Sequence, residues 1–221
     1  MGEHKRRGFA HVSDQIGAHV SRGELLERLE GDDPLISMTS FAGLELSGAP
    51  ARNATLEELV FRDCVFEEVD FSQSSLTDVR FTGCRFIGCT FERCWLNRVD
   101  FQDCSAPGLR FLKSRLTSVL FDACQLRYAD FSETNIKGLR ARKAALSETT
   151  WYGATLSKVE LEGCDLTRAE FVRTSLAGLD LSTCDIAGLT VSSDFHELRG
   201  SIIDREQAVD LVGLLGVRFA E

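Results

Sequence analysis

The central part of this chain lacks histidine, because its four histidines are His4, His11, His19 and His196. Without an imidazole near its serines and cysteines, residues 41–193 offer no Cys–His pair and no Ser–His–Asp arrangement for nucleophilic catalysis. Paired carboxylates such as Glu57 and Glu58 are expected to face solvent, and no phosphate-binding glycine loop is present. The sequence therefore argues against an enzyme and predicts neither catalytic nor cofactor-binding residues.

Long hydrophobic runs are also missing. No stretch of eighteen apolar residues occurs, and the N-terminus has no apolar segment of the signal-peptide kind. These absences predict a cytoplasmic protein without membrane contact. The 221 residues, of which 43% are hydrophobic, are enough for one core, and no linker divides them.

The eight cysteines show no Cys-x-x-Cys spacing, which metal sites commonly use. His11 and His19 are eight residues apart without a cysteine nearby, so we expect them in a solvated N-terminal arm rather than at a metal. No metal and no other cofactor is predicted. The cysteines are expected to be reduced thiols that pack as small hydrophobic side chains.

What the chain does contain is an apolar residue at every fifth position from Phe41 to Val191, 31 positions in one register. Helices and strands do not produce this pattern, because side-chain periods of 3.6 and 2.0 drift out of phase with five. We call these apolar residues the centres. The positions two residues before each centre form a second column, which never carries charge and holds all eight cysteines. Ten glycines stand two residues after a centre, where we expect turns with positive φ. Residues 106–109, with Pro107 and Gly108 in the middle, predict a type II turn.

A period of twenty residues overlies the period of five. One line of centres reads Phe71, Phe91, Phe111, Phe131, Trp151 and Phe171, and one line of the second column reads Cys64, Cys84, Cys104, Cys124, Cys164 and Cys184, interrupted by Ala144. Four pentads therefore make one square coil of a solenoid. At about 4.8 Å per coil, nearly eight coils give a rod of about 36 Å with ladders of Phe, Leu and Cys in its core.

These columns resemble the pentapeptide-repeat family, whose inner positions are Leu or Phe at the centre and Ala, Cys, Ser, Thr or Val two residues before it. The resemblance covers about 150 of the 221 residues. It implies an all-β solenoid, a right-handed quadrilateral parallel β-helix without catalytic residues. We expect this β-helix over residues 41–193, an N-terminal arm and capping helix over 1–40, and a C-terminal cap and dimerisation helix over 194–221.

Both ends carry helix signals, as expected because a solenoid exposes its terminal coils. Ser21 and Glu24 predict a capping box, followed by the short apolar face of Leu25, Leu26 and Leu29. Asp204 and Gln207 begin a second helix, predicted to end at Gly216, whose apolar residues cover an arc of about 220°, about twice what packing on one surface needs.

The C-terminal helix is therefore expected to have a second partner. Residues 198–221 also resemble the tails of the quinolone-resistance branch of the family, which implies end-to-end joining of two rods. We predict a homodimer whose interface consists of Val209, Leu211, Val212 and Leu215. Capping without dimerisation is the alternative.

One side of the predicted rod has a net charge of +3 and exposes aromatic and apolar side chains among basic ones. Its partner-binding candidates are Trp95, Leu112, Lys113, Arg115, Tyr152 and Val172. Outward tryptophan and tyrosine beside arginine are typical of protein-contact surfaces. The sequence therefore favours a non-catalytic scaffold that presents a surface to a macromolecular protein partner.

The resemblance implies an alternative, because some quinolone-resistance members resemble B-DNA and bind DNA gyrase in its place. A rod of about 36 Å that copied duplex DNA would need about 20 negative charges. Residues 41–193 carry 21 acidic and 17 basic residues, a net charge of −4. No looped insertion interrupts the five-residue register. The outward column of Arg80, Asp100, Leu120 and Arg140 mixes signs and predicts pairing between coils. These features weigh against DNA mimicry, and the total charge of −9 opposes direct nucleic-acid binding.

Overall fold

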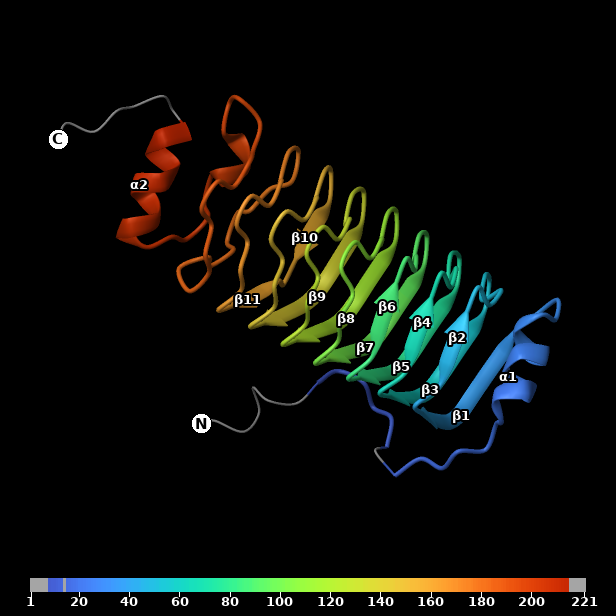
Figure 1. Cartoon of the computed structure of the whole chain (residues 1–221). Helices are drawn as coiled ribbons and strands as arrows, with labels where there is room; N and C mark the ends of the chain where they lie inside the picture. The colour runs from blue at the N-terminus through green and yellow to red at the C-terminus, as the bar shows by residue number, and fades with distance from the viewer. Residues whose placement is uncertain (1–7, 14, 215–221) are drawn as a thin grey trace.

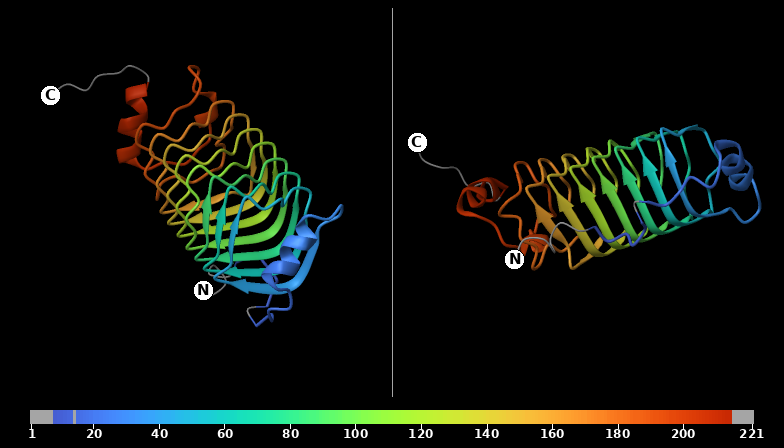
Figure 2. Two further views of the ribbon diagram at one scale, coloured as in Figure 1. Left: turned by 45° about the vertical axis from the view of Figure 1, so that its right-hand side comes forward. Right: turned by 90° about the horizontal axis from the view of Figure 1, so that it is seen from below.

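The computed structural model describes residues 8–13 and 15–214, and its main body is a parallel β-solenoid wound around one axis (Figure 1). Strands of successive coils pair at a spacing of twenty residues, so that Leu56 lies between Ile36 and Leu76. The oblique view on the left of Figure 2 shows the coils stacked one behind another. The predicted all-β solenoid with a twenty-residue coil is confirmed.

The principal sheet has eight strands, of which six are eight residues long: β1 (Leu35–Ala42), β3 (Thr55–Arg62), β5 (Ser75–Thr82), β7 (Trp95–Gln102), β8 (Arg115–Asp122) and β9 (Asn135–Arg142). The short strands β10 (Thr155–Ser157) and β11 (Glu160–Glu162) both pair with β9. A three-stranded sheet on another side contains β2 (Glu45–Ser47), β4 (Val65–Glu67) and β6 (Arg85–Ile87).

The regular strands cover about six coils, fewer than the nearly eight predicted. After β9 the twenty-residue spacing continues mainly through single bridges, for example between Asp165 and Asp185 and between Glu170 and Thr190. At the other end the solenoid begins before residue 41, the predicted boundary, because Ile36 is fully buried and pairs with Leu56.

The core is built from the two inward columns. Every centre residue from Phe41 to Ile186 is buried except Leu156, which is half-buried. All eight cysteines are buried, free thiols. The aromatic ladder stacks Phe71 on Phe91 with ring centroids 4.6 Å apart, and Trp151 on Phe131 at 4.1 Å. The predicted ladders of Phe, Leu and Cys are therefore confirmed.

The corners of the coils use left-handed backbone at the position two residues after each centre. The ten glycines predicted there all have positive φ, but so do larger residues such as Asp63 (φ 52°) and Arg98 (φ 54°). In the predicted type II turn, Gly108 has φ 69° and Leu109 N donates to Ala106 O at 3.3 Å. Hydrogen bonds between coils hold these corners, so glycine is favoured there without being required.

Helix α1 (Arg22–Leu29) covers the N-terminal end of the rod. Its predicted capping box is present, because Ser21 Oγ accepts from Glu24 N and the Glu24 carboxylate accepts from Ser21 N. Leu25 and Leu29 are buried, and Leu26 is half-buried against the core.

Helix α2 (Arg205–Leu214) lies at the other end, after the 3-10 turn η2 (His196–Leu198). Asp204 and Gln207 hydrogen-bond reciprocally, and Gln207 Nε2 also donates to the carbonyls of Leu181 (2.9 Å) and Cys184 (2.7 Å). This amide therefore fixes α2 to the last coils. Gly216, the predicted end of the helix, lies outside the described residues. Within the described ranges, no helix is both long and apolar enough to span a membrane.

The N-terminal arm differs from the sequence expectation. Residues 8–13 and 15–20 lie along one side of the rod, across the strands of the principal sheet, as Figures 1 and 2 show. Ala10, Val12 and Val20 of this arm are buried. The expectation of a solvated arm is wrong for this segment, although His11 and His19 themselves are exposed.

Candidate functional site

The first predicted contact residues lie at the beginning of β7 and β8. Trp95 pairs in parallel register with Ser75 and Arg115, and 53% of its surface is exposed. Because Cys94 points inward, the side chain of Trp95 points outward. Arg115 is exposed as well, so a guanidinium and an indole occupy adjacent coils on one face.

Leu112 and Lys113 precede Arg115 in the same coil. Leu112 is half-buried, and Lys113 is exposed, with its ammonium 3.6 Å from the Glu133 carboxylate. We call Trp95, Leu112, Lys113 and Arg115 the tryptophan cluster. It combines a large apolar surface with two basic groups, which suits a protein contact.

Tyr152 and Val172 form a second group on the same side. The Tyr152 hydroxyl accepts a hydrogen bond from Arg173 Nη1 (2.7 Å), and the same guanidinium lies 5.7 Å from the ring centroid. Gly153 N donates to Val172 O, so these two coils are adjacent. Residues 131–135 separate this group from the tryptophan cluster, so the six candidates form two groups on one side rather than one patch.

Sequence reasoning missed Tyr128, which is 55% exposed. It occupies a corner position with φ 63°, where glycine and small polar residues are common, and Arg127 lies 5.7 Å from its ring centroid. An aromatic residue at a corner column is the signal that could have revealed it.

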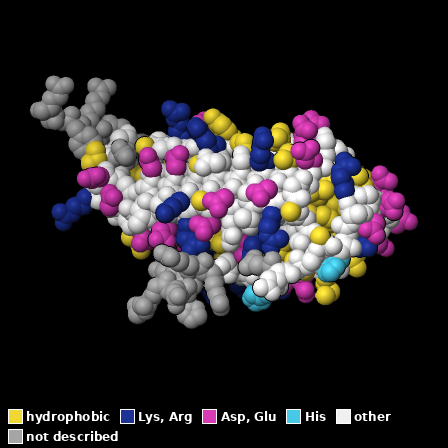
Figure 3. Space-filling model, turned by 60° about the horizontal axis from the view of Figure 1, so that its bottom comes forward, with side chains coloured by type: hydrophobic (Ala, Val, Ile, Leu, Met, Phe, Trp, Pro, Cys, Tyr) yellow, Lys and Arg dark blue, Asp and Glu magenta, His cyan; other side chains and the backbone are white. Residues whose placement is uncertain are grey.

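Charged side chains on the rod pair along its axis, as the mixed columns predicted. Ion pairs between adjacent coils include Arg110–Glu92 (3.3 Å), Arg140–Glu160 (3.1 Å) and Arg142–Asp122 (2.8 Å). Both signs are interspersed on the face in Figure 3. The described surface in that view has no continuous acidic stripe.

A further surface lies under the N-terminal arm. We call it the arm face and define it by the outward column Ser40, Val60, Arg80, Asp100, Leu120 and Arg140, which pair successively in the principal sheet. Val60, Asp100 and Leu120 are fully buried although they belong to an outward column. Apolar residues at two outward positions of one column were the sequence signal for a covering segment.

Two carboxylates of this region hold the arm. Asp100 accepts from Phe9 N (2.7 Å) and Ala10 N (3.3 Å), and Asp78 accepts from His11 N (2.8 Å). Burial raises the pKa of Asp100, although the two N–H donors and Arg80 oppose this shift. A hydrogen bond from Arg98 lowers the pKa of Asp78, since it stabilises the ionised form.

The predicted dimer residues lie on α2. Val209 is 50% exposed, Leu211 and Val212 are half-buried, and Leu215 lies outside the described residues. A hollow of about 640 Å³ lies between α2 and the last coils, lined by Cys184, Ile186 and Val209 among others. Cys184 and Ile186 are themselves more than nine-tenths buried, so the apolar side chain exposed beside this hollow is that of Val209.

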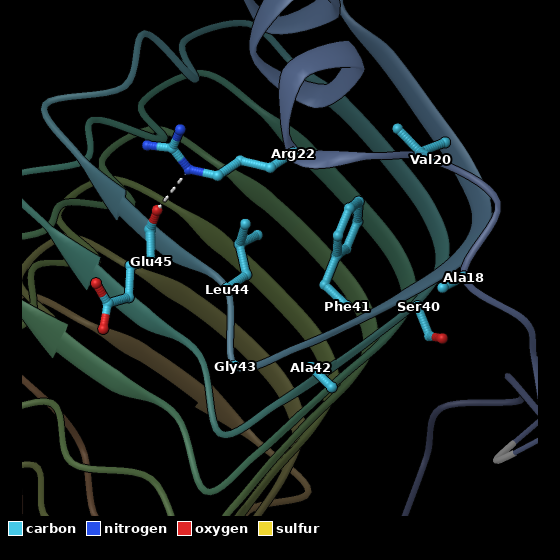
Figure 4. Close-up of a pocket in the computed structure, with 9 residues that line it drawn as sticks. All are labelled: Ala18, Val20, Arg22, Ser40, Phe41, Ala42, Gly43, Leu44 and Glu45. Atoms are coloured by element: carbon cyan, nitrogen blue, oxygen red, sulfur yellow. Dashed lines mark hydrogen bonds between the residues drawn. The ribbon is translucent and has the colours of Figure 1, made fainter.

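A similar hollow of about 520 Å³ lies at the N-terminal end (Figure 4). Phe41 and Leu44 line it together with Val20, and Arg22 Nε donates to Glu45 O at 3.2 Å. Because these apolar side chains are already more than nine-tenths buried, the hollow is a gap in the cap.

Asp194, His196 and Glu197 are the described residues whose side chains could hold a metal together. His196 already contacts both carboxylates, at 2.7 Å and 3.4 Å. Glu197 is fully buried and accepts hydrogen bonds from Arg173 N and from the N–H and hydroxyl of Ser192. These bonds lower the pKa of Glu197 despite its burial, and they assign the carboxylate a structural role in the last coils.

Comparison with protein families gives two overlapping matches. A model described as a pentapeptide repeat region matches residues 74–151, and a model of eight pentapeptide repeats matches residues 45–83 and 152–186. Together they span residues 45–186. No curated protein matches the sequence significantly.

Comparison with solved structures gives matches that cover most of this chain. A trypsin-treated form of QnrB1, a plasmid-mediated fluoroquinolone resistance protein, is 21% identical, with 85% of this chain and 99% of that chain covered and a TM-score of 0.42. HetL of Nostoc sp. strain PCC 7120, involved in heterocyst differentiation regulation, is 16% identical, with 84% and 98% covered and a TM-score of 0.30. A pentapeptide repeat protein of the Arabidopsis thaliana thylakoid lumen is 20% identical, with 60% and 74% covered and a TM-score of 0.29.

Proposed function

This chain belongs to the pentapeptide-repeat family, and from that premise we propose that it is a non-catalytic scaffold that binds a protein partner through the tryptophan cluster. The solenoid supports this proposal because its hydrogen-bonded coils fix outward side chains in a rigid array. We place its action in the cytoplasm, without a cofactor.

The exposure of Trp95 is the observation that carries the proposal. An indole with 53% of its surface exposed gains free energy when a partner covers it, and tryptophan and arginine are enriched among residues that dominate binding energy. Arg115 adds a charge in the adjacent coil. The partner surface should therefore offer an apolar pocket for the indole and acidic groups beside it.

Site-specific photo-crosslinking tests this proposal in the native cells. A photoreactive phenylalanine analogue in place of Trp95 should form a discrete adduct with one protein, and Arg115→Glu in the same chain should abolish it. The analogue in place of Ile87, which is 42% exposed in β6 on another side, is the matched control. Equal adducts at both positions, or no adduct at Trp95, would refute the tryptophan cluster as the contact.

Binding to DNA gyrase in place of DNA is a second candidate. It is supported by the net charge of −9 and by the resemblance of the C-terminal tail to the quinolone-resistance branch, whereas the ion pairs between coils oppose it. Supercoiling by purified gyrase, with and without a fluoroquinolone, distinguishes the candidates. Protection or inhibition by low micromolar protein would support this function, and an unchanged reaction would exclude it.

Homodimerisation through α2 is part of the proposed architecture. The exposed side chain of Val209 and the hollow beside it support a second copy packing at this end of the rod. Two joined rods would present two tryptophan clusters, which raises avidity for a partner with repeated sites.

A further inference from the structure

The N-terminal arm contacts the rod as a peptide ligand contacts a receptor. Its described residues form no strand, and one backbone–backbone hydrogen bond, from Ser40 N to Gly17 O (3.0 Å), joins them to the solenoid. The other polar contacts are made by side chains of the rod to the backbone of the arm. The polar contacts of the rod therefore go to the backbone of the arm.

The strongest polar contacts come from Asp100, which is fully buried under the arm. Its two carboxylate oxygens accept the consecutive N–H groups of Phe9 and Ala10, and Arg80 Nη2 donates to Ala10 O at 3.4 Å. The Arg80 guanidinium also lies 3.7 Å from the Asp100 carboxylate. The rod therefore supplies an acceptor pair and a donor that match one extended peptide unit.

Side-chain contacts set what kind of segment fits. The Arg140 guanidinium lies 4.5 Å from the Phe9 ring centroid, a cation–π geometry. Ala10 and Val12 pack against Val60 in a small apolar cluster separate from the main core. A suitable segment therefore has an aromatic residue followed by small apolar residues.

Gly8 shows how closely the arm approaches the rod. A Cβ atom at this position would lie 1.9 Å from Asp100 Oδ2 and 2.4 Å from its carboxyl carbon. A side chain at residue 8 is therefore incompatible with the observed contact, since real Cβ atoms do not approach so closely. The observed contact with Asp100 therefore favours glycine at the position that precedes the aromatic residue.

Arm docking also reaches the corner of the rod. Asp78 accepts from His11 N, and Arg98 donates to the same carboxylate through Nε (2.8 Å) and Nη2 (2.5 Å). Because Arg98 holds Asp78 independently of the arm, this acceptor is already oriented when the arm is absent. A preformed acceptor reduces the ordering cost of binding.

We propose that the arm face is a binding site for an extended peptide segment of the form glycine, aromatic residue, small apolar residue, and that residues 8–12 of the chain are its resident ligand. In the scaffold function proposed above, a partner segment of the same chemistry would compete with the arm for this site. The competition rests on the proposed function, whereas the peptide site is independent of it.

A peptide in trans tests the site with the full-length chain. The probe is a fluorescein-labelled peptide with the sequence of residues 8–20, and binding is followed by anisotropy. Gly8→Ala should release the arm without altering the rod, and Gly23→Ala is the matched control because a Cβ there meets no atom within 4 Å. We expect the Gly8→Ala protein to bind the peptide at least about tenfold more tightly than the wild type, since the tethered arm no longer competes at a high effective concentration.

Hydrogen exchange provides the independent readout of arm release. The amides of Phe9, Ala10 and His11 should exchange faster in the Gly8→Ala protein than in the wild type. In the Gly23→Ala protein, their exchange rates should equal those of the wild type. Adding Asp100→Asn to Gly8→Ala should weaken peptide binding at least about tenfold, because the site loses its charged acceptor. A released arm without improved peptide binding would overturn the proposal. Retained amide protection in Gly8→Ala, or unchanged peptide affinity with Asp100→Asn, would do the same.

Discussion

Truncating Phe91 is the most informative test of the core. This side chain is fully buried, and its ring stacks between Phe71 and Phe111 with centroid distances of 4.6 Å and 5.7 Å. It also meets Phe86 and Phe101 edge-on at 5.9 Å and 6.4 Å. Phe91→Ala therefore leaves a cavity bordered by four aromatic rings.

The expected loss follows from that geometry. Phenylalanine to alanine in a core costs about 3 to 5 kcal/mol of unfolding free energy, and the upper part of this range applies because rings stacked in fixed coils cannot collapse into the gap. Urea titration followed by far-UV circular dichroism measures the change. Tyr152→Ala is the control, because that ring is 38% exposed and its removal loses mainly the contacts with Arg173, so the unfolding free energy should fall by only about 1 kcal/mol. A loss below about 1 kcal/mol for Phe91→Ala, or a loss equal to that of the control, would show that the centre column does not form the core.

Three further predictions concern the ends and surfaces of the rod. Leu211→Asp should convert a dimer into monomers in light scattering while the β-sheet spectrum stays intact; a variant that remains dimeric would make α2 only a cap. In the native protein, iodoacetamide should modify Cys184 faster than Cys94, because Cys184 lines the hollow beside α2, whereas Cys94 is enclosed in the core, where burial raises the pKa of its thiol to about 12; equal rates by mass spectrometry would contradict this. Asp78→Asn should lower the unfolding free energy by about 1 to 3 kcal/mol at neutral pH. The pKa of Asp78 is held below its ordinary value of 3.8, so the difference in unfolding free energy between the two proteins should be full above pH 3.8 and should shrink as the pH falls below that value. A difference that does not change with pH would refute the Arg98 contact as its cause.

The solenoid could be predicted from the sequence because its contacts repeat. Each coil places Phe71, Phe91 and Phe111 at the same point of the cross-section, so one register defines inward and outward positions for the whole rod. The number of regular coils was overestimated, because the register does not distinguish strands from the single bridges after β9.

The arm could not be predicted in the same way. Its contact from Phe9 to Asp100 joins residues 91 positions apart and uses a backbone N–H group, which leaves no side-chain pattern in the arm. The only trace in the repeat is the pair of apolar residues Val60 and Leu120 in an outward column. A prediction of inward and outward positions assigns such residues to solvent unless a covering segment is considered.

The predicted contact residues lie on one side of the rod but not in one patch. The five-residue register indicates the side on which Trp95 and Tyr152 lie, and both are exposed there. It does not indicate that Arg173 would bind the Tyr152 hydroxyl, because that contact depends on side-chain conformations in neighbouring coils.

The two tryptophans allow the most direct test of the central claim, that a register of five determines which side chains face the core and which face solvent. Trp151 is a centre residue, 1% exposed and stacked between Phe131 and Phe171. Trp95 occupies an outward position of the repeat and is 53% exposed. Iodide quenching of the single-tryptophan variants Trp95→Phe and Trp151→Phe measures both positions separately. The account predicts strong quenching of Trp95 and little quenching of Trp151. Equal quenching of the two, or stronger quenching of Trp151, would contradict it.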